Sequence, residues 1–208
     1  MSNGIRRILE PVFVFLAVAC LVELSLGMTG WFGEDVILWG TLLRAIFTVP
    51  GLAYFYREDK AGRGEWRLGI KTAVLLVVAG AGLSVAFRFL FMAIGVPGYE
   101  AVEENLMTGN LLLQAVALLA ASPILEEFFF RGVLYGRLKE LVSVPAAMAV
   151  SSALFGLYHG NLSQGIYAFF MGILLAWAME HCRTVAGPIL LHVAANAAAI
   201  WLNLVIML

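Results

Sequence analysis

The stretch that decides the fold class runs from residue 109 to 139 and reads GNLLLQAVALLAASPILEEFFFRGVLYGRLK. It is apolar over most of its length, and about 20 apolar residues are enough for a helix to cross the hydrocarbon core of a bilayer. The rest of the chain has the same character: 62% of its 208 residues are hydrophobic, and the mean hydropathy is +0.93. Soluble domains are about half apolar, so the sequence predicts an integral membrane protein.

Working outward from this stretch, seven apolar segments are candidates for membrane-spanning helices. They are residues 10–27, 36–56, 70–95, 109–139, 145–160, 163–181 and 187–206, of which the fifth is short. We therefore expect an all-α polytopic fold of about seven helices, with eight as the alternative count. The sequence shows no internal repeat and no polar stretch long enough for a soluble domain, so we expect a single integral membrane domain over residues 1–208.

The charges between the apolar segments predict the orientation. Ten Lys and Arg residues lie in the loops or at the ends of these segments, and all ten fall on one side: Arg6, Arg7, Arg57, Lys60, Arg63, Arg67, Lys71, Arg137, Lys139 and Arg183. The alternate loops have no Lys or Arg and carry acids: Glu34, Asp35, Glu100, Glu103 and Glu104. Cytoplasmic loops collect cations, so we expect the N-terminus in the cytoplasm and, with seven spans, the C-terminus outside. The apolar run 12–22 is interpreted as an uncleaved first helix, because further spans follow it.

Composition also narrows the partners. The net charge is -1 and only 13% of the residues are charged, so nothing indicates a nucleic-acid partner. The two cysteines, Cys20 and Cys182, lie far apart in or beside apolar segments, and we interpret them as free thiols. The bilayer itself is the partner that the sequence indicates most directly.

Ionisable residues inside a bilayer are costly, so each one needs a reason. Glu23, Arg44 and Arg88 occur singly on the first three segments, and their simplest interpretation is structural, with Glu23 paired to one of the two arginines across helices. The remaining ones gather on the last four segments.

Three pairs spaced four residues apart stand out on those segments. In Ser122-Pro-Ile-Leu-Glu-Glu-Phe-Phe-Phe-Arg131, Glu127 and Arg131 share a helical face, which suits an ion pair. Glu126 points about 100° away from Glu127 and stays free for another partner. Pro123 cannot donate a backbone hydrogen bond, so it loosens the helix just before the glutamates. The other two pairs are Phe155 with His159 and His192 with Asn196.

These residues suggest hydrolytic chemistry. Glu126 and His159 each lie about 20 Å from the same cytoplasmic loop at 1.5 Å per residue, so they share one depth. A Glu beside a His can act as a general base for water. A second histidine and an asparagine amide one turn apart make a pair of donors for an oxyanion. His192 fits the depth less well: either the turn before it is sunk into the membrane, or its helix starts elsewhere.

Other interpretations remain open at this point. Two His and a Glu also make a reasonable zinc triad, although no His-Glu-x-x-His motif is present. A second alternative is a non-catalytic membrane scaffold, but a scaffold would not need all of these polar residues in the last four segments. A transporter that uses the buried carboxylates is a third alternative, but transporters often show inverted repeats. Phe128, Phe129 and Phe155 are most simply packing or lipid-facing side chains.

The three motifs, in order on consecutive apolar segments, resemble those of the CPBP family of intramembrane endopeptidases, which comprises CAAX prenyl proteases and bacteriocin-processing proteins and is also called the ABI family. The resemblance covers roughly residues 109–206 and implies that the last four helices form the catalytic core. It implies that Glu126 and His159 activate water and that His192 and Asn196 stabilise the oxyanion, with Glu127, Arg131 and Phe155 in support. It implies no cofactor and no metal. Larger relatives have eight spans, where this chain has about seven.

The resemblance also implies a substrate class: a membrane-anchored protein or peptide cleaved near its C-terminus. Family members process CaaX proteins, bacteriocin-like peptides or proteins with C-terminal sorting signals. The short loops are typical of a prokaryotic member in the cytoplasmic membrane, which favours a sorting-signal or peptide substrate. An immunity protein with the same fold, without catalysis, is the alternative.

Overall fold

The computed structural model describes residues 3–29, 33–59, 67–97 and 110–206. Every regular element in these ranges is a helix. Five of the loop charges used for the orientation, Lys60, Arg63, Glu100, Glu103 and Glu104, lie outside the described residues, as does residue 109.

The helices follow the predicted segments closely. In chain order they are α1 (Asn3–Thr29), η1 (Gly33–Asp35), α2 (Val36–Glu58), α3 (Ile70–Ile94), α5 (Leu111–Val116), η2 (Ala117–Ala121), α6 (Ser122–Glu127), η3 (Phe128–Tyr135), α7 (Gly136–Leu138), α8 (Val144–Tyr158), α9 (Leu162–Cys182) and α10 (Ala186–Ile206). The run from α5 to α7 is one apolar span, Leu111–Leu138. The first helix begins earlier than predicted, and the exposed ion pair of Arg6 and Glu10, one turn apart, lies at the start of this helix.

Six helical spans in the described part of the chain are long and apolar enough to cross a membrane. The seventh apolar helix, α8, has only 15 residues, in agreement with the short fifth segment. The prediction of an all-α polytopic membrane protein is confirmed.

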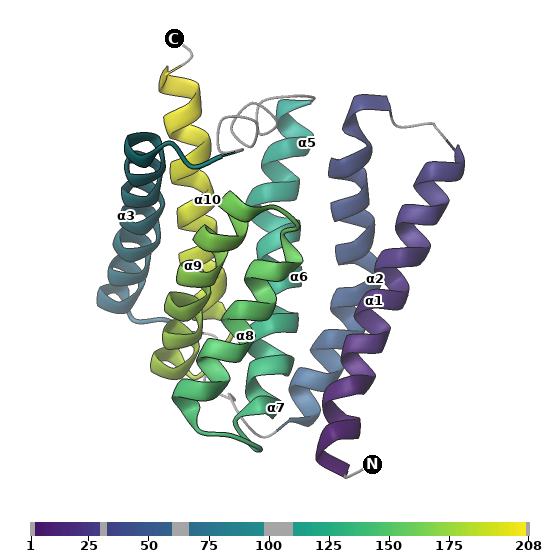
Figure 1. The fold of residues 1–208 in the computed structure, drawn as a ribbon. Coiled ribbons are helices and arrows are strands. Elements are labelled where there is room, and N and C mark those ends of the chain that lie inside the picture. The colour runs from purple at the N-terminus through teal and green to yellow at the C-terminus, as the bar shows by residue number, and fades with distance from the viewer. Residues whose placement is uncertain (1–2, 30–32, 60–66, 98–109, 207–208) are drawn as a thin grey trace.

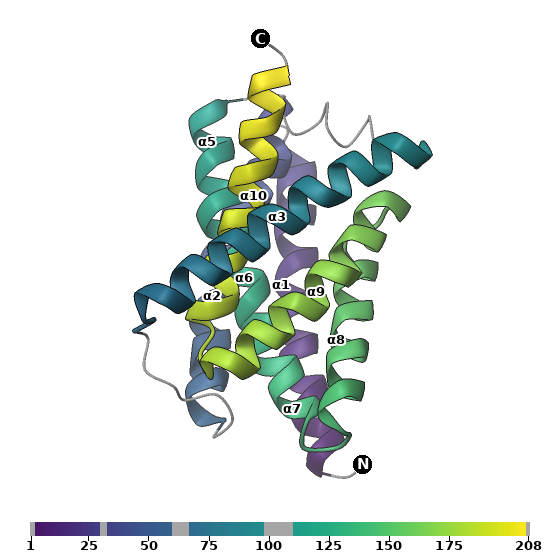
Figure 2. The same ribbon diagram turned by 90° about the vertical axis from the view of Figure 1, so that its left-hand side faces the viewer.

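The span from α5 to α7 lies between two groups of helices (Figure 1). The helices α1 and α2 pack together on one side, whereas α3 packs along α10 and α8 along α9. Figure 2 shows that α3 and α9 are strongly tilted relative to α10. The N-terminal end of α1 and the C-terminal end of α10 lie at opposite ends of the bundle in both views, as an odd number of crossings requires.

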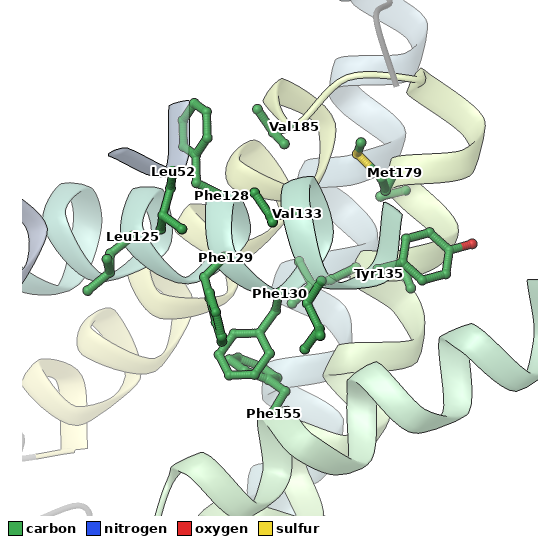
Figure 3. Close-up of a cluster of buried hydrophobic side chains, with 14 of the residues drawn as sticks. Leu52, Leu125, Phe128, Phe129, Phe130, Val133, Tyr135, Phe155, Met179 and Val185 are labelled. Atoms are coloured by element: carbon green, nitrogen blue, oxygen red, sulfur yellow. The ribbon is translucent and has the colours of Figure 1, made fainter. Parts of the chain in front are cut away.

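A buried aromatic cluster surrounds the central span. Phe128, Phe129 and Phe130 leave η3 in different directions, and Phe155 from α8 meets Phe130 (Figure 3). The ring centroids of Phe130 and Phe155 are 5.0 Å apart, and Phe129 stacks on Phe15 of α1 at 4.0 Å. Phe128, Phe129 and Phe155 are therefore packing residues and do not face lipid.

Ion pairs tie three helices together at the end where the chain begins. Asp59, which follows α2, is almost fully buried. It forms ion pairs with Arg7 of α1 and Arg137 of α7, each at 2.7 Å. Arg7 also contacts Glu140 at 2.6 Å. This network joins charges that the sequence placed on one side of the membrane, so those charges lie at one end of the bundle.

Candidate active site

A cavity of about 450 Å³ lies between the helices and is lined by several polar residues of the last four spans. All four residues that the sequence singled out as catalytic border it: Glu126, His159, His192 and Asn196. Residues of α2 and α3 complete the wall, among them Thr41, Arg44, Ser84 and Arg88. The second and third long helices, which carry no motif, therefore help to form the cavity.

The Glu126 carboxylate is held on one side and free on the other. Its Oε1 atom accepts a hydrogen bond of 2.5 Å from the Ser122 hydroxyl, one turn earlier on the helix. Its buried Oε2 atom has no hydrogen-bond partner among the described residues and lies 3.9 Å from Nε2 of His192. This oxygen can therefore still accept a hydrogen bond.

Glu127 is the centre of a buried hydrogen-bonded group. Its Oε1 atom accepts from Arg131 at 3.2 Å, and both side chains are fully buried. The same oxygen contacts Nδ1 of His192 at 2.8 Å. This contact links α6 to α10, because the two residues are 65 positions apart in the chain. Because an ionised carboxylate only accepts, Nδ1 carries the proton in this contact and Nε2 is directed toward Glu126.

Neighbouring side chains fix the position of the Arg131 guanidinium. Its guanidinium lies over the ring of Phe155 at 4.2 Å, a cation–π contact that replaces part of the lost hydration. A Cβ atom at Gly172 would come within 3.0 Å of Arg131 Nη2, so a side chain at this position of α9 would displace the arginine. Phe155 also makes edge contacts with His159 and His192, at 4.8 and 6.0 Å between ring centroids.

His159 follows directly after α8 and lines the cavity from there. Its Nδ1 atom donates to the carbonyl of Phe155 at 2.8 Å, which fixes the ring and leaves Nε2 as the basic nitrogen of the neutral form. The sequence predicted that Glu126 faces this histidine. Within the described residues no hydrogen bond or ion pair joins the two, and the histidine that Glu126 approaches is His192.

Asn196 lies one turn after His192 on α10. Its amide nitrogen donates to the carbonyl of Leu118 at 2.8 Å, which leaves the second amide hydrogen available. Leu118 belongs to η2, a π-helical segment, and a second π-helical segment, η3, begins at Phe128. The two glutamates thus sit on the short α-helix between two widened turns, a distortion often found at functional sites.

The depth of His192 is explained by the turn before α10. Thr184 and Val185 in this turn are completely buried, and the Val185 amide donates to the Tyr56 hydroxyl at 3.4 Å. The turn is therefore packed inside the bundle, and the helix that follows it brings His192 to the glutamates.

The sequence missed two contributors to this site. Ser122 is four residues before Glu126, the same spacing that predicted the other pairs, so the pattern could have indicated it. Arg44 was expected only as a structural partner of Glu23, from which it is indeed 3.8 Å away, but it also borders the cavity. In the described ranges no three His, Cys, Asp or Glu side chains form a group suited to hold a metal ion.

Comparison with known proteins supports the resemblance seen in the motifs. Residues 108–198 match the family described as type II CAAX prenyl endopeptidase Rce1-like. The protein named "Putative membrane peptidase YdiL" of Bacillus subtilis is 30% identical over 107 residues, which cover 49% of this chain and 44% of that protein. The "Membrane-embedded CAAX protease MroQ" of Staphylococcus aureus is 32% identical over 80 residues, 36% of this chain and 32% of that protein.

The chain matches less than half the length of each of these relatives. No solved structure matches it. The resemblance to the CAAX prenyl protease family is confirmed over residues 108–198.

Proposed function

We propose that this chain, whose residues 108–198 are Rce1-like, is an intramembrane endopeptidase that uses Glu126 to activate water. The observation that carries the proposal is the free Oε2 atom of Glu126, buried in a cavity that His159, His192 and Asn196 also line. A buried carboxylate with one oxygen tied and the other free is arranged to accept a proton from water.

In this mechanism a water molecule between Glu126 and the histidines gives a proton to the carboxylate, and its oxygen attacks the carbonyl carbon of the substrate. The tetrahedral intermediate carries an oxyanion, which needs donors placed in advance. The free amide hydrogen of Asn196 and the Nε2 atom of His192, when protonated, are the donors. The intermediate then collapses, the C–N bond breaks, and Glu126 returns its proton to the leaving amine. His159 assists the water from its basic nitrogen.

Glu127, Arg131 and Phe155 are positioning residues in this proposal. Glu127 holds Nδ1 of His192 and so orients its ring, while Arg131 balances the charge of Glu127. Phe155 contacts Arg131, His159 and His192 at once.

The proposed catalytic core comprises residues 109–206 within a single integral membrane domain. The substrate would be a membrane-anchored protein or peptide cleaved near its C-terminus, of the sorting-signal, CaaX-like or bacteriocin type. Support comes from the apolar, membrane-embedded surroundings of the cavity and from the names of the two relatives.

The test compares the wild-type protein with Glu126→Gln in proteoliposomes, using acylated quenched-fluorescence peptides with apolar C-terminal segments. We expect Glu126→Gln to lower cleavage at least about 100-fold, as loss of a general base does, while the protein inserts and unfolds as the wild type does. Turnover retained in this variant would refute the glutamate mechanism. A chelator-sensitive activity restored by zinc would favour the metal-dependent alternative, and a wild-type protein without turnover would favour the scaffold or immunity alternative.

A further inference from the structure

Arg44 brings a positive charge to the cavity in which the proposed hydrolysis takes place. It lies on α2, outside the three motifs, and borders the same cavity as Glu126 and His159. We propose that Arg44 is a specificity residue that binds a carboxylate group of the substrate. This inference rests on the proposed function of the cavity and adds a recognition site to it.

The hydrogen bonds of Arg44 do not neutralise its positive charge. Its three guanidinium nitrogens donate to neutral oxygens: Nε to the carbonyl of Gly40 at 3.2 Å, Nη2 to the Thr41 hydroxyl at 3.2 Å, and Nη1 to the Tyr158 hydroxyl at 3.4 Å. These are long bonds, and bonds of an arginine to a carboxylate are about 2.7–2.9 Å. An arginine has five N–H donors, so donors remain for a ligand.

Glu23 is the acidic partner of Arg44, and it neutralises the charge only in part. The distance is 3.8 Å, and the Glu23 side chain is 59% exposed at the surface of α1. By contrast, the buried Arg131 is 3.2 Å from a fully buried Glu127. Arg44 thus borders the cavity, and its ion pair with Glu23 is weak.

Position links Arg44 to the reacting groups. Tyr158, which accepts from Arg44, precedes His159 in the chain, and the two rings contact edge to face at 5.9 Å. The other arginine of the cavity wall, Arg88, is bonded to Asn203 of α10. A substrate carboxylate bound to Arg44 would therefore lie near His159.

A carboxylate is the ligand that this geometry favours. The planar guanidinium fork matches the two oxygens of a carboxylate, and the pair is strong where water is scarce. Within the substrate this group has two sources: the C-terminal carboxylate, or an Asp or Glu side chain near the cleaved bond. Either source would fix the register of the peptide relative to Glu126.

The experiment uses one acylated fluorescent peptide in four forms, in which the C-terminus is a free acid or an amide and one internal residue is Asp or Asn. Wild type should cleave the form with the recognised carboxylate at least about 10-fold better in kcat/KM than its neutral counterpart, mainly through KM. Arg44→Gln should bring this ratio to about one, and Arg44→Lys should retain part of it. The pair of peptides that shows the ratio identifies the source.

Glu23→Gln is the matched control, because it breaks the same ion pair from the other side. If Arg44 only ties α1 to α2, Glu23→Gln and Arg44→Gln will impair all four peptides alike, and the proposal is overturned. A ratio of acid to neutral near one in the wild type overturns it as well.

Binding of the same peptides to the Glu126→Gln variant separates this proposal from the proposed function. The carboxylate-containing form should bind at least about 10-fold more tightly, and adding Arg44→Gln should remove the difference, whether or not the wild type cleaves. Equal binding of all forms would refute carboxylate recognition even if the peptides are cleaved.

Discussion

Two adjacent glutamates have different surroundings because consecutive residues on a helix point about 100° apart. Glu126 faces the cavity and keeps one oxygen without a partner among the described residues, whereas Glu127 is enclosed with Arg131 and His192. The first arrangement suits a group that exchanges protons with a substrate. The second suits a fixed charge that orients a histidine.

Ser122 provides the first prediction for a single residue. Its hydroxyl ties Oε1 of Glu126, so Ser122→Ala should let the carboxylate rotate and lower kcat about 10-fold, equivalent to roughly 1.4 kcal/mol in the barrier. The KM value should change little. Ser122→Thr keeps the hydroxyl and should recover most of the rate, and an unchanged kcat in Ser122→Ala would show that the contact has no role in catalysis.

The Glu127–Arg131 pair provides a second prediction. Both side chains are fully buried, so Glu127→Gln leaves an uncompensated charge and should lower the free energy of unfolding by about 3–5 kcal/mol. The Arg6–Glu10 pair has the same spacing but is exposed, and Glu10→Gln should cost only about 0.5 kcal/mol. Unfolding of both variants in detergent micelles measures the difference. The double variant Glu127→Gln, Arg131→Met should be more stable than Glu127→Gln alone, and the idea of a stranded charge fails if it is not.

Contacts within one helix were predicted from the sequence more fully than contacts between helices. The spacing of Glu127 and Arg131 predicted their ion pair, because one helical turn brings them together. The approach of His192 to both glutamates depends on how deeply the turn at Thr184 and Val185 is buried. That depth follows from tertiary packing, which one-dimensional spacing does not contain.

At the level of helices, the boundaries were predicted to within a few residues except at the start of α1, because long apolar runs end at charges and turns. The widened turns were predicted only in part. Pro123 lacks an amide hydrogen, and the π-helical segment η2 just before it is the loosened turn expected there. The segment η3 has no proline, and its π-helical form had no signal in the sequence.

The packing of α3 against α10 provides a prediction at this level. A Cβ atom at Gly80 would lie 2.3 Å from the backbone carbonyl oxygen of Leu191, next to His192. Gly80→Ala should therefore push the two helices apart and cost about 1–3 kcal/mol in thermal stability. At Gly82, two residues along the same helix, a Cβ atom would meet no described atom within 4 Å, so Gly82→Ala should be neutral or slightly stabilising. Equal stability of the two variants would contradict the close packing.

For the whole molecule, the cavity lies toward the end of the bundle opposite the N-terminus. Its wall includes Ile37 and Thr41 at the start of α2, Phe91 at the end of α3 and Asn203 near the end of α10. The turn between α8 and α9 stops short of that end in both views, because α8 has only 15 residues. If the cationic end is cytoplasmic, as the loop charges predict, the cavity lies nearer the outer side of the membrane.

This orientation predicts which side of the membrane reaches the cavity. In a background with Cys20→Ala and Cys182→Ala, the variant Gln164→Cys places a thiol on the cavity wall at the start of α9, and Ser143→Cys places one in the exposed loop at the opposite end. A membrane-impermeant maleimide added to intact right-side-out vesicles should label Gln164→Cys and spare Ser143→Cys, and inverted vesicles should give the reverse. The reverse result in right-side-out vesicles would place the N-terminus outside and the cavity on the cytoplasmic side. Every candidate substrate would then enter from the cytoplasm. Labelling does not require turnover, so it determines the side from which a substrate enters even if Glu126 proves not to be catalytic.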